Sequence, residues 1–298
     1  MGAVKALVVG GSGFVGAHLA RELAKRGHRV RVLSRDPDRG HLEPGVETYR
    51  GDVTDPGSIE DAFRGIDAVV YLVALTPLFR PRGGERMHER LHLAGARNTV
   101  AAATGAGVPR LLHMSALGAD PAGATAYLRA KGRAEEIVRA SGLGWTIFRP
   151  SVVFGDGGEF VSSVKRLAPP YLTPLPGGGR IRFQPIWVGD LVPMMADALE
   201  DDRHVRQTYD VGGPEPVSLA DVARMAHAAE GRPVRVVPVP LALAGLGLTL
   251  AGLVPGFPMG PDQYRSLLMD NVPSRNAVGA FGRDPADLRT LESYLAGG

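Results

Sequence analysis

The 298-residue sequence contains no cysteine, which excludes disulfide bonds, thiolate metal sites and cysteine nucleophiles. It also lacks the Gly-x-x-x-x-Gly-Lys-Ser/Thr motif of P-loop nucleotidases and the Gly-x-Ser-x-Gly elbow of serine hydrolases. Lysine and arginine form no dense run and the net charge is only +3, so no nucleic-acid partner is expected. The missing cysteines fit a reducing compartment, and we expect a cytoplasmic protein.

Long hydrophobic runs are absent as well. The uncharged stretch 241–254, bracketed by Pro240 and Pro255, has fourteen residues, whereas a membrane-spanning helix needs roughly 20. We expect a buried helix here; the alternatives are a wall for an apolar substrate and a peripheral membrane or protein contact. The apolar N-terminal stretch is interrupted by Lys5 and is predicted to be a core strand, not a signal peptide.

Glycine, by contrast, is placed where a nucleotide site needs it. Gly10, Gly13 and Gly16 form a Gly-x-x-Gly-x-x-Gly pattern between an apolar stretch, 3–9, and a helical pattern, 14–26. Such glycines allow a tight turn and a close approach of the backbone to a pyrophosphate, which the helix N-terminus then attracts. A second predicted strand completes a β-α-β unit, so the pattern predicts dinucleotide binding.

Strands and helices alternate through the first half of the chain, which predicts a parallel sheet. The fold class is therefore α/β: a doubly wound parallel sheet (Rossmann) with a small, interleaved C-terminal substrate lobe. We assign 1–155 plus about 184–213 to the nucleotide-binding domain, and about 156–183 and 214–298 to the small lobe. Strands are expected near 4–9, 29–34, 46–49, 68–72, 110–114, 145–148 and 207–211, and helices near 14–26, 58–63, 86–105, 124–140, 186–200 and 218–230. Residues 169–180 are expected to form a Pro/Gly loop.

Three residues suggest chemistry at a carbonyl or hydroxyl group. Tyr127 and Lys131 are four residues apart on a predicted helix and therefore share one face. A nearby ammonium is expected to lower the tyrosine pKa and prepare it for acid–base work. Ser115 follows the strand at 110–114, at the sheet edge where open α/β proteins bind ligands, and its hydroxyl can orient a reacting oxygen.

The end of the second strand indicates which nicotinamide cofactor is preferred. NAD sites place an acidic residue there, whereas this chain has Ser34 and Arg35. Arginine can pair with a 2′-phosphate and stack on adenine, so we favour NADP. Asp36 comes next and leaves NAD as the alternative.

One motif is set aside. His88-Glu89-Arg90-Leu91-His92 matches the zincin pattern on a predicted helix. No third ligand pattern follows, so no metal site is expected, and the match is interpreted as a chance occurrence on a solvated helix face.

With these motifs in place, the chain resembles an extended or atypical short-chain dehydrogenase/reductase, akin to epimerases and dehydratases. The segments 115–120, 149–155, 183–191 and 209–219 most resemble the branch that holds the nucleotide-binding accessory subunit of respiratory complex I and its bacterial relatives. The resemblance implies that Ser115, Tyr127 and Lys131 are catalytic. It further implies cofactor contacts at Gly10, Ser12, Gly13, Phe14, Val15, Gly16, Ser34, Arg35, Asp52, Val53, Val73, Ala74, Lys131, Pro150 and Val153. In place of the family's glycine-rich stretch after the fourth strand, this chain has Leu72 to Pro77.

We therefore predict an NADP(H)-binding oxidoreductase acting on a carbonyl or hydroxyl of an unidentified small molecule, which is apolar if the stretch 241–254 lines its site. One alternative is a nucleotide-binding accessory or assembly protein with a structural cofactor and little turnover. The other is a sugar-nucleotide epimerase or dehydratase. The sequence indicates no integral membrane segment and does not fix an oligomeric state.

Overall fold

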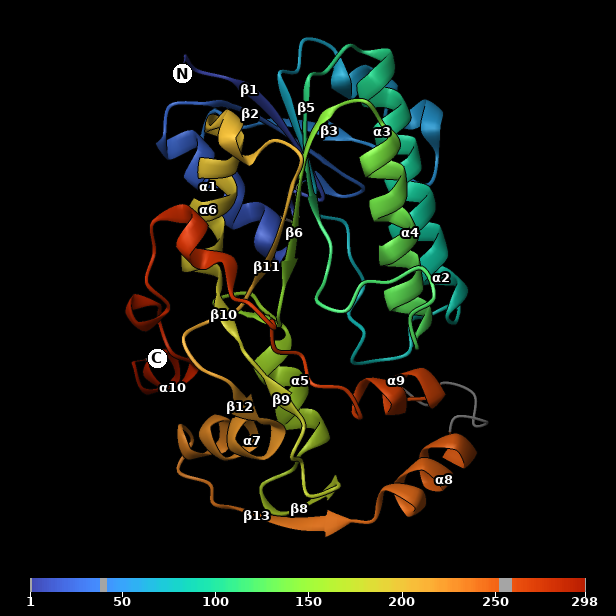
Figure 1. Ribbon diagram of the computed structural model, residues 1–298, viewed down its shortest axis with the longest axis vertical. Coiled ribbons are helices and arrows are strands. Elements are labelled where there is room, and N and C mark those ends of the chain that lie inside the picture. The colour runs from blue at the N-terminus through green and yellow to red at the C-terminus, as the bar shows by residue number, and fades with distance from the viewer. Residues whose placement is uncertain (1, 38–41, 252–258, 298) are drawn as a thin grey trace. The chain divides into compact units, whose positions relative to one another are not determined.

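The computed structural model describes residues 2–37, 42–251 and 259–297, and the chain forms two compact units (Figure 1). The first unit comprises Met1–Leu75, Arg86–Pro150 and Val188–Tyr209, and the second comprises Thr76–Glu85, Ser151–Trp187 and Asp210–Gly298. The chain thus passes between the units several times. The short segment 76–85, which lies inside the range expected for the nucleotide-binding domain, packs with the second unit.

A seven-stranded sheet organises the first unit. Its strand order is β11-β6-β5-β4-β1-β2-β3, and the pairs from β6 through to β3 are parallel. The strands are β1 (Lys5–Val9), β2 (Arg29–Ser34), β3 (Glu47–Arg50), β4 (Ala68–Tyr71), β5 (Arg110–Met114), β6 (Gly144–Pro150) and β11 (Gln207–Val211). The order reverses between β1 and β4, and ligands of open α/β sheets bind at the carboxyl ends beside such a switch point. The predicted fold class is confirmed.

Helices cover both faces of this sheet. They are α1 (Phe14–Lys25), α2 (Arg86–His88), α3 (Gly95–Gly105), α4 (Ala126–Ala140) and α6 (Val188–Glu200). Figure 1 shows α1 beside α6 on one face and α3 beside α4 on the other, in agreement with their contacts. The central strand β4 is buried at every residue, as expected of a strand covered on both sides.

Two helices of the first unit differ from their predictions. The expected helix 58–63 consists of two 3-10 turns, Pro56–Ser58 and Glu60–Phe63, because Gly65, at φ 66°, ends the segment before an α-helix can develop. The expected helix 86–105 forms without a break, but its turns between α2 and α3, Glu89–Ala94, are π-helical instead of α-helical. π-Helical segments are rare and occur frequently at functional sites.

The second unit combines short strands with α-helices, five of them in the residues that the structure describes. The strands are β7 (Val153–Phe154), β8 (Tyr171–Pro176), β9 (Arg182–Phe183), β10 (Ile186–Trp187), β12 (Val217–Ser218) and β13 (Val234–Val239). The helices are α5 (Phe160–Leu167), α7 (Leu219–Ala228), α8 (Leu241–Ala251), α9 (Pro261–Ser266) and α10 (Leu291–Ala296). The expected capping of α7 is confirmed, because the Ser218 hydroxyl accepts a hydrogen bond from Asp221 N at 3.1 Å.

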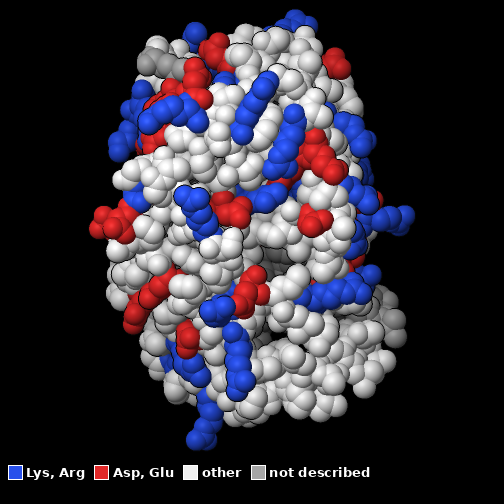
Figure 2. Space-filling view, viewed as in Figure 1, with Lys and Arg blue, Asp and Glu red and all other residues white. Residues whose placement is uncertain are grey.

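Two predictions for the second unit are wrong. The expected loop 169–180 contains β8, whose prolines are tolerated because β8 is an edge strand that pairs, within the described residues, only with β13. The helix α8 is not buried: Leu243, Leu246 and Leu250 are 62, 59 and 56% exposed. Residues 252–254, the end of that uncharged stretch, lie outside the described residues. Figure 2 shows an uncharged surface over α8.

Candidate nucleotide and catalytic site

The glycine loop between β1 and α1 needs glycine for two different reasons. Gly10 has φ 85°, and a Cβ atom there would lie 3.1 Å from the backbone nitrogen of Val73. A Cβ atom at Gly16 would overlap the Gly10 carbonyl oxygen and lie 2.6 Å from the Gly11 Cα atom. The first glycine makes the turn, and the last lets α1 pack directly on the loop.

Gly13 is the glycine that faces outward. It is exposed and occupies the N-cap of α1 in an extended conformation, and no side chain among the described residues caps this helix. A Cβ atom there would meet only the Gly10 carbonyl oxygen, at 3.2 Å. Open backbone at a helix N-terminus suits a pyrophosphate, so this loop fits a dinucleotide. Ser12 and Phe14 beside it are partly exposed, whereas Val15 points into the core.

The residues predicted to hold the adenosine end follow β2 and β3. The Ser34 hydroxyl is buried without a hydrogen-bond partner in the described part of the chain, while Arg35 is exposed. Burial favours the neutral form of Asp52, but hydrogen bonds from the Thr54 backbone and hydroxyl, at 2.8 and 2.9 Å, outweigh it and lower the pKa of this carboxyl. Arg35 contributes to the lowering, which shows that Arg35 and Asp52 share one electrostatic environment.

The remaining predicted cofactor residues fall at three places. Val53 is buried, and its carbonyl accepts a hydrogen bond from Asn98 Nδ2 at 2.8 Å. Val73 and Ala74 follow β4, next to Gly10. Pro150 ends β6 in the first unit, whereas Val153 begins β7 in the second.

Helix α4 carries Tyr127 and Lys131 on one face. Thr125 fixes the start of this helix, because its hydroxyl accepts a hydrogen bond from Leu128 N at 3.2 Å. Lys131 is only 1% exposed, and its ammonium donates to the Met114 carbonyl oxygen at 2.8 Å, beside Ser115. The Ser115 hydroxyl is buried without a hydrogen-bond partner among the residues described, so it is available to a ligand oxygen.

The pKa values differ from the expectation for a tyrosine beside an ammonium. Burial raises the pKa of Tyr127 instead of Lys131 lowering it. Burial also lowers the pKa of Lys131 to about 8, although Glu135 opposes the shift. Desolvation therefore dominates both groups, and the tyrosine is a phenol at neutral pH.

Glu135 anchors the base of this site. It is 1% exposed, accepts two hydrogen bonds from Arg149, at 2.6 and 2.8 Å, and one from Arg139 at 2.9 Å. A buried carboxylate needs such partners, because an uncompensated charge in the interior is costly. The pair with Arg149 ties α4 to β6, whereas Arg139 lies one turn further along α4 itself.

The histidines predicted to lie on a solvated helix face are buried. His88 is 1% exposed and His92 0%, and their rings stack with centroids 5.5 Å apart. Both meet the Tyr127 ring edge-on, at 5.6 and 5.3 Å. The four-residue spacing of the histidines indicates in the sequence that they share one helix face. That this face packs on α4 cannot be deduced from the spacing. Within the described ranges, no three His, Cys, Asp or Glu side chains are grouped so that they could hold a metal ion.

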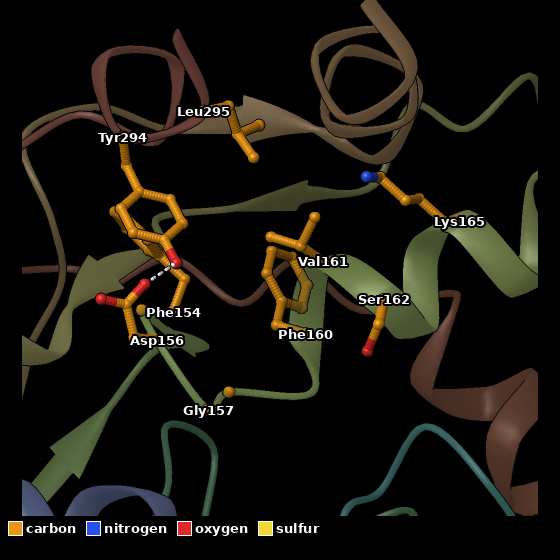
Figure 3. A pocket seen from close by; sticks show the side chains of 11 residues that line it. Phe154, Asp156, Gly157, Phe160, Val161, Ser162, Lys165, Tyr294 and Leu295 are labelled. Atoms are coloured by element: carbon orange, nitrogen blue, oxygen red, sulfur yellow. Dashed lines mark hydrogen bonds between the residues drawn. The ribbon is translucent and has the colours of Figure 1, made fainter. Parts of the chain in front are cut away.

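The second unit has a cavity of its own, of about 360 Å³ (Figure 3). Phe154, Phe160 and Val161 line it together with Tyr294, whose hydroxyl donates to Asp156 Oδ1 at 2.7 Å. Burial, helped by Asp156, raises the pKa of Tyr294 to about 12. The cavity combines an apolar wall with one fixed phenol–carboxylate pair.

Comparison with known proteins gives the family of the chain. The NAD(P)H-binding family profile matches residues 10–165, which is more than half of the sequence and contains the glycine loop, Ser115, Tyr127 and Lys131. The chain belongs to the NAD(P)H-binding family. Within it, the chain is an atypical short-chain dehydrogenase/reductase, as the resemblance predicted.

Two relatives and one solved structure are similar to this chain over most of its length. The NAD(P)H azoreductase of Xenophilus azovorans is 29% identical over 90% of this chain and 91% of its own length. The mitochondrial NADH dehydrogenase (ubiquinone) 1 alpha subcomplex subunit 9 of Arabidopsis thaliana is 29% identical over 92% of this chain and 72% of its own. The UDP-glucose 4-epimerase of Thermus thermophilus in complex with NAD superposes with a TM-score of 0.74, at 21% identity, over 98% and 96% of the two chains. The last similarity shows the fold.

The surface of the protein carries charges of both signs. Figure 2 shows acidic and basic side chains interspersed on the face in view, in line with the small net charge. In the ranges that the structure covers, no helix has both the length and the apolar character needed to cross a membrane.

Proposed function

We propose that this protein is an NADP(H)-dependent reductase that acts on a carbonyl group or a comparable polar double bond of a small molecule. The observation that carries the proposal is the arrangement of Tyr127 and Lys131 on one face of α4, with Ser115 at the carboxyl end of β5. The glycine loop at the end of β1 supports nicotinamide binding in the same unit.

Each residue has a distinct role in this proposal. Tyr127 donates a proton to the reacting oxygen, and its raised pKa keeps that proton in place at neutral pH. Ser115 offers its unshared hydroxyl to the same oxygen and orients it. Lys131, with a pKa of about 8, is poised to exchange a proton close to physiological pH. The nicotinamide, when bound, supplies the hydride.

The preference for NADP rests on Ser34 and Arg35. Arg35 is exposed at the end of β2 and is free to pair with a 2′-phosphate, for which the buried Ser34 hydroxyl offers a further hydrogen bond. Titration with NADPH and NADH, followed by nicotinamide fluorescence, tests the preference. Arg35→Ala should weaken NADPH binding by about ten-fold, the worth of one charge-assisted pair, and leave NADH unchanged. Equal effects on both cofactors would contradict the assignment.

Turnover is tested with Tyr127→Phe. We would measure NADPH oxidation with 9,10-phenanthrenequinone as a carbonyl probe and with methyl red, because one relative is an azoreductase. The variant should keep the cofactor Kd and lose at least about a hundred-fold in kcat with the carbonyl probe, the usual worth of a general acid. Unchanged turnover in a variant that binds NADPH would refute the role of Tyr127.

A nucleotide-binding accessory protein is the second candidate. The exposed leucines of α8 favour it, since they suit an apolar partner, and a complex I subunit is among the relatives. In that case Tyr127→Phe would leave partner binding intact. A sugar-nucleotide epimerase is less well supported, because the uncharged α8 does not suit a sugar phosphate.

A further inference from the structure

His92 contacts two parts of the candidate site that are far apart in the sequence. Its ring lies edge-to-face with Tyr127, with centroids 5.3 Å apart and an interplanar angle of 87°. Such T-shaped contacts hold a ring in a preferred orientation and contribute beyond simple burial. Because His92 is fully buried, the contact is shielded from water.

The same ring also holds the loop after β4. Leu75 N donates a hydrogen bond to His92 Nε2 at 3.4 Å, while the Nδ1 atom of the ring is buried without a hydrogen-bond partner among the described residues. Because Nε2 accepts this hydrogen bond, the proton of a neutral imidazole is on Nδ1. Val73 of the same loop lies against Gly10, so this loop borders the glycine turn.

The ring stays neutral in this environment. Burial lowers the pKa of His92 well below its usual range, and the nearby charges of Lys131, His88 and His113 add to the effect. The π-helical segment Glu89–Ala94 places His92 between the loop 73–75 and α4. Such segments are rare and occur frequently at functional sites.

We propose that His92 is a positioning residue that couples the loop 73–75 to the orientation of the Tyr127 phenol. His92 then positions both the loop that holds the expected cofactor contacts, Val73 and Ala74, and the acid group of Tyr127. The inference rests on the proposed function for the role of Tyr127, but the coupling itself is a property of the free protein.

Two substitutions separate the two contacts. His92→Phe keeps an aromatic ring against Tyr127 and loses the hydrogen bond from Leu75 N. His92→Asn keeps a donor and an acceptor but loses the ring. His113→Phe is the matched control: His113 is equally buried, but its ring stacks on Tyr71 at 5.5 Å instead of on Tyr127.

The first readout is hydrogen exchange of the peptide that contains residues 73–75, which needs no substrate. His92→Phe should speed exchange of the Leu75 amide about five-fold, the worth of one hydrogen bond, and weaken NADPH binding by a similar factor. His113→Phe should change neither. Unchanged exchange in His92→Phe, or equal acceleration in both variants, would overturn the proposal.

The second readout separates kcat from KM with 9,10-phenanthrenequinone. His92→Asn should lower kcat about ten-fold with little change in the KM for NADPH, and the loss should vanish in a Tyr127→Phe background. An equal loss in both backgrounds would show a merely structural role. If Tyr127→Phe alone retains full turnover, the proposed function fails, while the exchange experiment still decides whether His92 holds the loop. If His92→Phe does not fold, His92→Leu, which also lacks the acceptor nitrogen, replaces it in the exchange experiment.

Discussion

Replacing Lys131 with methionine should stabilise the protein while it removes a residue of the proposed site. Lys131 is 1% exposed, and burial lowers its pKa from 10.5 to about 8. The unfolded chain therefore binds the lysine proton more tightly than the folded protein does. Below about pH 8 this difference is a full penalty on folding, and the penalty disappears as the pH rises towards 10.5.

The magnitude follows from the two pKa values. The penalty is about 3 kcal/mol at pH 7 and falls to about 1 kcal/mol at pH 9.5. Methionine matches the length of much of the lysine chain but loses the hydrogen bond to the Met114 carbonyl, worth about 1 kcal/mol. The net gain is about 2 kcal/mol at pH 7, or roughly 4–8 °C in Tm, and is close to zero at pH 9.5.

Thermal unfolding of both proteins at pH 7 and pH 9.5 measures the effect. Lys25→Met is the control, because Lys25 is exposed on α1 and should stay within about 0.5 kcal/mol of the parent protein at both pH values. A Lys131→Met protein that is no more stable than the parent at pH 7 would refute the reasoning. So would a gain that keeps its size at pH 9.5.

Three further predictions concern the same unit. Gly13→Ala should change Tm little, because its methyl group would meet only the Gly10 carbonyl oxygen, at 3.2 Å. It should weaken NADPH binding at least about ten-fold by fluorescence titration, because the methyl group sits at the exposed N-cap of α1, where a pyrophosphate would bind. Gly16→Ala should lower Tm by several degrees, since its methyl group overlaps backbone and overpacking costs about 1–3 kcal/mol. Burial and the nearby Lys131 hold the pKa of His113 well below its usual range. The unfolded chain therefore binds a proton that the folded protein does not, and stability falls as the pH drops below about 6.5. Urea unfolding at pH 5 and pH 8 should show a smaller loss of stability at the lower pH for His113→Phe than for the parent protein. Thr125→Ala should cost about 1 kcal/mol in the same assay by removing the cap of α4, and a rescue by Thr125→Ser but not by Thr125→Val would attribute the loss to the hydroxyl.

Sequence reasoning succeeded where one local pattern determines one local structure. The glycine loop is predictable because its turn, its exposed N-cap and its close packing each require glycine at a fixed spacing, and Gly10 and Gly16 meet backbone atoms as expected. The strands of the main sheet are predictable for a similar reason. A strand such as β4, covered on both faces, is a continuous apolar run.

The errors arose where tertiary packing overrides the local pattern. His88 and His92 match a polar helix face, but α4 packs over them, and the helix sequence alone does not contain that information. The leucines of α8 match a core helix, yet they are exposed. The prediction of a loop over 169–180 missed β8, because the strand that pairs with it in the described residues, β13, is distant in the sequence.

The pKa of Tyr127 is the error with the greatest consequence for function. Spacing alone predicts that Lys131 stabilises a tyrosinate, whereas burial raises the tyrosine pKa and lowers the lysine pKa. Both shifts favour the uncharged forms, a phenol and an amine, because a water-excluded site penalises either charge. A phenol can donate a proton to a developing alkoxide at once, whereas oxidation of an alcohol first requires the tyrosine to lose that proton. A tyrosine at its ordinary pKa of about 10 is also a phenol at neutral pH, so burial changes the cost of removing that proton, which rises.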